Sequence, residues 1–156
     1  MVGDHEAPAR LAGEGLQVRL ELLERRPNDE IRAAIMRADI VADQFIAGYA
    51  LFAIEGMAAS RPVLSALSWL PEDVRAVLDA RGLPIVDADL ETLEAQLRRL
   101  IEDPAGRRAL GEAGRRFVID NHSYAAVGAE WDRLIRLVWA GERPAAPQDP
   151  ATAQPL

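Results

Sequence analysis

The sequence predicts an α/β fold built around a short parallel sheet. Three observations carry this prediction: short apolar runs recur through about the first ninety residues, helical patterns separate them, and each strand and helix together take roughly twenty residues. Neighbouring parallel strands need a crossover of a dozen or more residues, usually a helix, whereas antiparallel neighbours need only a tight turn. We therefore expect about four parallel strands flanked by helices, and two or three further helices at the end.

The individual elements follow from two kinds of hydrophobic pattern. Alternating apolar and polar residues predict a half-buried or edge strand at 16–23, "LQVRLELL". Continuous apolar runs predict three short buried strands, which are 39–45, 61–67 and 83–88. Apolar residues at helical spacing predict four helices, which are 26–38, 51–59, 71–80 and 89–102. Several of these segments also carry a helix-start signal or are followed by a helix-stop residue.

Strand patterns cease beyond residue 103. Residues 103–121 form one helical pattern, and Ser123 is expected to cap a second helix. Trp131 and Trp139 stand eight residues apart on one apolar face of that second helix. We expect this face to pack into the core, and the alternative is that part of it is exposed and contacts another chain.

The two ends of the chain lack patterns that could pack. Residues 1–15 are therefore expected to be frayed, and the folded domain is expected to span 16–141. The last segment, 142–156, contains four prolines and almost no large apolar residue, so we expect it to be disordered.

Composition excludes several classes of function. The 156 residues carry 18 basic and 25 acidic side chains, a net charge of −7, so nucleic acids and anionic membranes are not expected partners. There is no cysteine, which excludes disulfides, thiolate zinc sites and thiol nucleophiles. No apolar stretch is long enough for a transmembrane helix or signal peptide. The expected location is the cytoplasm.

One apolar segment, "IAGYALFAIEGMA" at 46–58, carries a single acid, Glu55. It follows the strand that ends near Asp43, where parallel sheets bind ligands, and Gly48 suits a tight turn before a helix that begins around Leu51. The free amides of a first helical turn favour a phosphate. A carboxylate such as Glu55 accepts hydrogen bonds and suits a ribose diol. The structural alternative is that Glu55 caps a backbone or pairs with an arginine.

Residues 38–67, "ADIVADQFIAGYALFAIEGMAASRPVLSAL", resemble the donor-binding signature of family 4 glycosyltransferases, which have the two-domain GT-B fold. Gly48-Tyr49-Ala50 matches the Gly-Phe-Gly part of that signature, Glu55-Gly56-Met57-Ala58 matches Glu-Ala-Met-Ala, and Arg61-Pro62-Val63 opens the next strand. The resemblance extends over about residues 16–140. It identifies the chain as the C-terminal, donor-binding part of such an enzyme, a partial Rossmann-like domain.

The resemblance implies retaining transfer of a sugar from a nucleotide-sugar donor, which is a substrate, with no cofactor and no protein-bound metal. Glu55 inherits the ribose-binding role. The backbone of Gly48, Tyr49, Ala50 and Leu51 would lie near the donor sugar and diphosphate. No catalytic residue is assigned.

Two departures from the family pattern limit the expected activity. The first glutamate of the family's pair falls at Ala47, and Asp43 or Gln44 is the candidate substitute. Residues 16–22 look like the third strand of a donor domain, so the first two strand–helix units and the N-terminal domain have no counterpart. We expect little or no transfer by this chain alone. Its partner would be a separately encoded N-terminal half or a second copy, and the alternative is a non-catalytic remnant or binding module.

The remaining polar residues are expected to have structural roles. His5 and His122 lack partner acids or cysteines at ligand spacing, so neither is expected to bind a metal. Four arginines of the 103–121 helix are expected to form a solvated face paired with acids, and they are Arg107, Arg108, Arg115 and Arg116.

Overall fold

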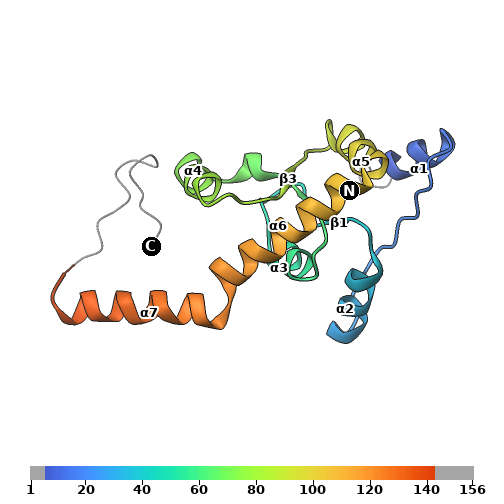
Figure 1. Cartoon of the computed structure of the whole chain (residues 1–156). Coiled ribbons are helices and arrows are strands. Elements are labelled where there is room, and N and C mark those ends of the chain that lie inside the picture. The colour runs from blue at the N-terminus through green and yellow to red at the C-terminus, as the bar shows by residue number, and fades with distance from the viewer. Residues whose placement is uncertain (1–5, 143–156) are drawn as a thin grey trace.

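The computed structural model describes residues 6–142 and contains a three-stranded parallel sheet (Figure 1). The strands are β1 (Val41–Ala42), β2 (Val63–Ser65) and β3 (Val86–Asp87), and they lie side by side in chain order. In the register, Val41 pairs with Val63 and Leu64 pairs with Val86. The predicted α/β class and parallel sheet are confirmed, with three strands among the described residues in place of about four.

Residues 6–142 also contain seven α-helices and one short 3-10 helix. They are α1 (Glu6–Gly13), α2 (Asn28–Arg37), α3 (Leu51–Ala58), the 3-10 helix η1 (Leu67–Trp69), α4 (Glu72–Ala80), α5 (Leu93–Glu102), α6 (Pro104–His122) and α7 (Tyr124–Trp139). The crossover from β1 to β2 contains α3, and the crossover from β2 to β3 contains η1 and α4. The helices predicted after residue 103 are confirmed.

Strand β2 is buried on both faces. Its neighbours Val63 and Leu64 are each 0% exposed and belong to different apolar clusters, because successive side chains of a strand point to opposite faces. The Val63 cluster draws on α2, α3 and α6; its buried members are Ile35, Val41, Ala53, Met57, Val63, Leu67, Ile85 and Phe117. The Leu64 cluster draws on α1 and α5; its buried members are Ala7, Leu64, Val86, Ala88, Leu93 and Leu100.

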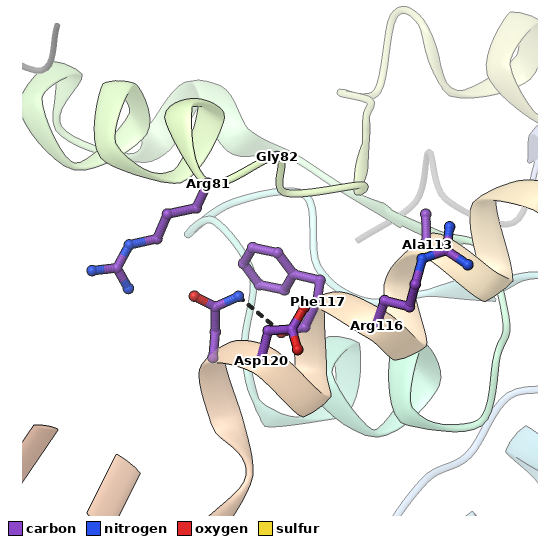
Figure 2. Close-up of a pocket in the computed structure, with 7 residues that line it drawn as sticks. Arg81, Gly82, Ala113, Arg116, Phe117 and Asp120 are labelled. Carbon is purple, nitrogen blue, oxygen red and sulfur yellow. Dashed lines mark hydrogen bonds between the residues drawn. The ribbon is translucent and has the colours of Figure 1, made fainter. Parts of the chain in front are cut away.

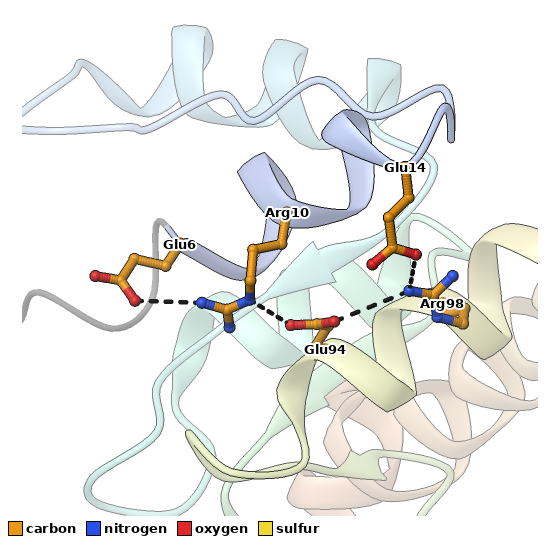
Figure 3. A network of polar contacts seen from close by, with 5 residues as sticks. All are labelled: Glu6, Arg10, Glu14, Glu94 and Arg98. Atoms are coloured by element: carbon orange, nitrogen blue, oxygen red, sulfur yellow. Dashed lines mark hydrogen bonds and ion pairs between the residues drawn. The ribbon is translucent and has the colours of Figure 1, made fainter.

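Helix α1 contradicts the expectation that residues 1–15 are frayed, over the range 6–13. Ala7 and Leu11 are buried and α1 packs on α5. Figure 3 shows the polar contacts above this packing: Arg10 lies between Glu6 and Glu94, and Arg98 lies between Glu14 and Glu94. Exposed pairs of this kind contribute at most about 1 kcal/mol each, so the buried apolar contacts hold α1 in place. Residues 1–5, including His5, lie outside the described residues.

The predicted strand at 16–23 is wrong. This segment forms no strand in the structure, and Leu20 and Leu22 are 45% and 54% exposed. Alternation of apolar and polar residues indicates a chain that fits a pleated surface, but a strand also needs a hydrogen-bonded neighbour. Among the described residues, the sheet ends at β1 on this side.

Helix α7 also differs from the prediction. None of its residues is buried, and Trp131 and Trp139 are 62% and 84% exposed, so they do not pack into a core. Figure 1 shows α7 extending away from the sheet after the end of α6. Ser123 caps it as predicted, since its hydroxyl accepts a hydrogen bond from the Ala126 amide at 3.1 Å. Disorder is predicted for 142–156. Of these, residues 143–156 lie outside the described residues, so the prediction stays untested there.

The arginines of α6 are not paired with acids as expected. Arg107 donates to the carbonyl oxygens of Leu100 and Ile101 in the last turn of α5, and Arg115 donates to the Ala58 carbonyl oxygen at the end of α3. These side chains satisfy carbonyl groups that a helix C-terminus leaves without partners. Arg108 and Arg116 form no ion pair within the described part of the chain.

Gly111 allows α6 to approach the chain that follows α3. A Cβ atom at this position would overlap the Ser60 carbonyl oxygen, which belongs to the backbone and has no side-chain freedom with which to move away. At Gly128 in α7, by contrast, a Cβ atom would meet nothing within 4 Å.

We therefore expect Gly111→Ala to lower the free energy of unfolding by about 1–3 kcal/mol, because it forces α6 off α3. Gly128→Ala is the matched control and is expected to raise helix stability by about 0.5–1 kcal/mol. Urea unfolding of both variants measures the difference. Equal stabilities of Gly111→Ala and the wild-type chain would contradict the close approach.

Candidate functional site

The candidate site is the segment 43–55, which leaves the carboxyl end of β1 and enters α3. Parallel strands bring their carboxyl ends to one edge of a sheet. Asp43 directly follows β1, Ser65 ends β2 and Asp87 ends β3. The structure therefore places polar side chains from three strands at the edge where the sequence predicts ligand binding.

Gly48 gives the loop its turn. It is buried and has φ +76°, a backbone conformation that residues with a Cβ atom rarely adopt. A Cβ atom here would also lie 2.7 Å from Cδ2 of Leu70. The prediction of a tight turn at this position is confirmed.

The Ser65 hydroxyl joins the loop to the end of β2. Its Oγ lies 3.0 Å from the Gln44 carbonyl oxygen and 2.8 Å from the Gly48 carbonyl oxygen. The side chain is 0% exposed. A hydroxyl has one hydrogen to donate, so these two carbonyl groups share it. Sequence reasoning missed Ser65, although a lone hydroxyl at a position buried among apolar residues is a signal of an internal hydrogen bond.

The Asp43 carboxylate ties the start of the loop to its end. Oδ2 accepts a hydrogen bond from the Ala50 amide at 2.7 Å. Partial burial raises the pKa of Asp43 above its ordinary value, and the hydrogen bond from Ala50 opposes that rise. The structure thus gives Asp43 a contact within the loop, and Gln44 contributes its backbone carbonyl.

Helix α3 begins at Leu51 as predicted, and its first turn has no side-chain cap. Ala50 occupies the cap position in an extended conformation, and Leu51 is 76% exposed. The first amides of a helix have no partner within the helix and carry the positive end of its dipole. The first amides of α3 therefore have no side-chain acceptor among the described residues.

Glu55 is exposed. α3 buries the side that carries Ala53, Gly56 and Met57, and Glu55 falls on another side because successive helical residues rotate by about 100°. Within residues 6–142 the Glu55 carboxylate makes no hydrogen bond and no ion pair, so the alternative of a cap or an arginine partner has no support among them.

Tyr49 is partly buried beside the Val63 cluster. Burial raises the pKa of its hydroxyl above the ordinary value, and the positive charge of Arg81 opposes the rise.

At the end of β3, Asp87 accepts hydrogen bonds from the Leu67 amide at 2.8 Å and from the Arg75 guanidinium at 2.7 Å. The Arg75 charge is thereby balanced within the chain.

A cavity of about 220 Å³ lies between the turn after α4 and the last turns of α6 (Figure 2). Its lining residues are Arg81, Gly82, Ala113, Arg116, Phe117, Asp120 and Asn121, and none belongs to 43–55. The guanidinium groups of Arg81 and Arg116 point away from each other. They do not form a cradle for a single small anion.

His122 lies beside this cavity, with its ring 5.8 Å from that of Phe117 and its Nε2 buried without a hydrogen-bond partner. The part of the chain that the structure describes contains no group of three or more histidine or acidic residues placed to hold a metal ion. In the same residues, no helix has the length and apolar character needed to cross a bilayer.

The family model described as "Glycosyl transferase-like" matches residues 4–133, which includes the sheet, the loop and α3. The chain belongs to this glycosyltransferase family. It is also 30% identical over 105 residues to the MMP alpha-(1->4)-mannosyltransferase of Mycolicibacterium hassiacum. That alignment covers 66% of this chain and 25% of the relative, so the chain matches about a quarter of the relative's length. No solved structure matches it.

His122 predicts a specific pH dependence. Burial, and after it the charge of Arg81, lower the pKa of His122 below the ordinary value of 6.5. The unfolded chain therefore takes up a proton at this residue more readily than the folded chain does. As a result, the free energy of unfolding decreases as the pH falls below 6.5.

Thermal melts of the wild-type chain and of His122→Gln between pH 7.5 and pH 5 measure this effect. The wild-type chain is expected to lose more of its melting temperature than the variant over this range. Acidic groups titrate in both proteins, so the difference between the two curves isolates the histidine. Parallel curves would contradict the prediction.

Proposed function

We propose that this chain is the donor-binding part of a retaining glycosyltransferase and that it receives a nucleotide-sugar at the N-terminus of α3. The observation that carries the proposal is the Glu55 carboxylate, exposed and unpaired among residues 6–142, one turn inside a helix start without a cap. The match of the glycosyltransferase family to residues 4–133 supports it.

Each part of the site has a separate role in this proposal. The Glu55 carboxylate accepts hydrogen bonds from the two ribose hydroxyls, because an ionised carboxylate is an acceptor only. The backbone of Gly48, Tyr49, Ala50 and Leu51 faces the diphosphate and the donor sugar, with the positive end of α3 stabilising the phosphate charge. No metal or cofactor takes part, and the nucleotide-sugar is a substrate.

The donor sugar is proposed from the relative. The name of the Mycolicibacterium hassiacum protein states that it is a mannosyltransferase, so a mannose nucleotide is the first donor to test. The acceptor of that enzyme is not transferred to this chain, because the alignment covers only 25% of its length.

We further propose that the 156-residue chain has little or no transferase activity by itself. Ala47 stands where the family has a sugar-holding glutamate and has no polar side-chain atom. Stabilising a leaving diphosphate requires fixed donors, each worth about 10²–10³ in rate. Arg75, at the carboxyl edge of the sheet, is held by Asp87.

The second candidate is a non-catalytic module that binds a nucleotide or a partner, and Ala47 favours it. Both candidates share a need for another chain. The apolar face of α7, with Trp131 62% exposed, is proposed to contact either a separately encoded N-terminal half or a second copy. No nucleic-acid partner is proposed.

Nucleotide binding tests the role of Glu55. UDP or GDP at about 100 times its dissociation constant is expected to stabilise the native chain by about 2.7 kcal/mol and to raise its melting temperature. Glu55→Gln is expected to weaken that binding about tenfold or more, since a charge-assisted hydrogen bond is lost. Binding of pyrophosphate, which has no ribose, is expected to be unchanged.

Glu112→Gln is the matched control, because Glu112 is exposed on α6 and makes no ion pair in the described residues. Isothermal titration calorimetry of both variants measures the affinities. If Glu55→Gln binds UDP and GDP as tightly as Glu112→Gln does, the ribose-binding role is wrong.

Turnover tests the predicted inactivity. The purified chain is incubated with a panel of nucleotide-sugars that includes GDP-mannose and UDP-glucose, and nucleotide release is followed. We expect no release above the rate of spontaneous hydrolysis. Steady turnover with any donor would overturn the prediction that this chain alone is inactive.

Size-exclusion chromatography with light scattering distinguishes the two partners proposed for α7. Self-association predicts a mass above 17.1 kDa that returns to the monomer value in a Trp131→Glu, Trp139→Glu double variant. A wild-type chain that elutes as a clean monomer at all concentrations would exclude self-association and leave the separately encoded half.

A further inference from the structure

We propose that Asp43 and Ser65 are positioning residues that hold the loop 43–50 in one shape before a ligand arrives. This inference rests on the proposed function, because it concerns the shape of the same donor site. Neither residue is proposed to touch the reacting atoms. Their effect reaches the ligand through the backbone between Gly48 and Leu51.

Asp43 fixes where α3 begins. Its Oδ2 lies 2.7 Å from the amide nitrogen of Ala50, the residue at the cap position of α3. This contact closes the loop across seven residues and leaves the amides beyond Ala50 without a side-chain cap. If the carboxylate instead bonded the amides beyond Ala50, it would occupy the positive end of the helix. In the structure it bonds only the Ala50 amide.

Ser65 fixes the middle of the loop against the sheet. Its backbone belongs to β2, the central strand, and its side chain is 0% exposed. The hydroxyl lies within hydrogen-bond distance of carbonyl oxygens near both ends of the turn, those of Gln44 and Gly48. With these carbonyl groups held toward the sheet, Gly48 keeps its left-handed conformation against Leu70.

The geometry favours positioning over a direct sugar contact for Asp43. One carboxylate oxygen is already bound to Ala50, and the side chain is partly buried. A negative charge on Asp43 beside the negative charges of a diphosphate is also unfavourable. The useful property of this side chain is therefore its acceptor oxygen. Asparagine has the same acceptor oxygen in the same place without the charge.

Four variants of the full 156-residue chain separate these roles. Asp43→Ala removes the acceptor, and Asp43→Asn keeps it. Ser65→Ala removes the hydroxyl from the loop, and Ser68→Ala removes an exposed hydroxyl for which the structure gives no hydrogen bond in the described residues. UDP and GDP are the binding probes, and amide hydrogen exchange of residues 44–50 is the loop probe.

We expect Asp43→Ala and Ser65→Ala to bind UDP or GDP about tenfold more weakly and to exchange the 44–50 amides faster. Asp43→Asn and Ser68→Ala are expected to stay within about twofold of the wild-type affinity. If Asp43→Ala does not fold, Ser65→Ala and Asp43→Asn carry the comparison. If Asp43 only stabilised the fold, Asp43→Ala would lower the melting temperature, and Asp43→Asn would not restore an affinity for UDP or GDP that Asp43→Ala had lost.

Two results would overturn the inference. One is wild-type affinity in both alanine variants of the loop, and the other is an Asp43→Asn variant that loses affinity as Asp43→Ala does, which would make the charge essential. If the wild-type chain binds neither UDP nor GDP, the proposed function fails and hydrogen exchange decides the positioning role alone. Equal exchange of residues 44–50 in all four variants would then overturn it.

Discussion

The burial of β2 on both faces is the constraint on which the rest of the structure depends. Val63 and Leu64 are adjacent, yet each is 0% exposed in a different cluster. A parallel strand of this kind needs helices on both sides, since either face left open would expose apolar surface to water. The α3 and α6 side supplies one cover, and the short α1 together with α5 supplies the other.

The same strand also holds the loop before α3 through one side chain. β2 ends in Ser65, whose buried hydroxyl contacts the Gln44 and Gly48 carbonyl oxygens of the loop. The loop is therefore attached to the core on both sides of Ile46, which is itself 68% exposed. A surface segment with an internal frame of this kind can present backbone amides to a ligand without first losing conformational freedom.

Sequence patterns predicted the three buried strands, α3 and the capped α7, because each depends on local periodicity or on one turn or cap residue such as Gly48 or Ser123. The position proposed for the donor site rests on the strand–loop–helix order and on the family signature, and it stays a prediction. The exposure of Glu55 was not predictable, since it depends on which surface a helix faces, and the exposure of Trp131 was only the alternative to core packing. The segment 16–23 has strand-like alternation but lacks a neighbour, and the contacts of Asp43 and Ser65 join residues 7 to 21 positions apart.

Helix α7 has a thermodynamic consequence of its own. Helices of this length obtain most of their stability from packing, and a helix of 16 residues is marginal in water without it. Here the Ser123 cap, the Asp132–Arg136 and Glu130–Arg133 pairs and contacts with α6 hold the helix. We therefore expect α7 in the free chain to open at a lower free energy than the sheet and the helices packed on it.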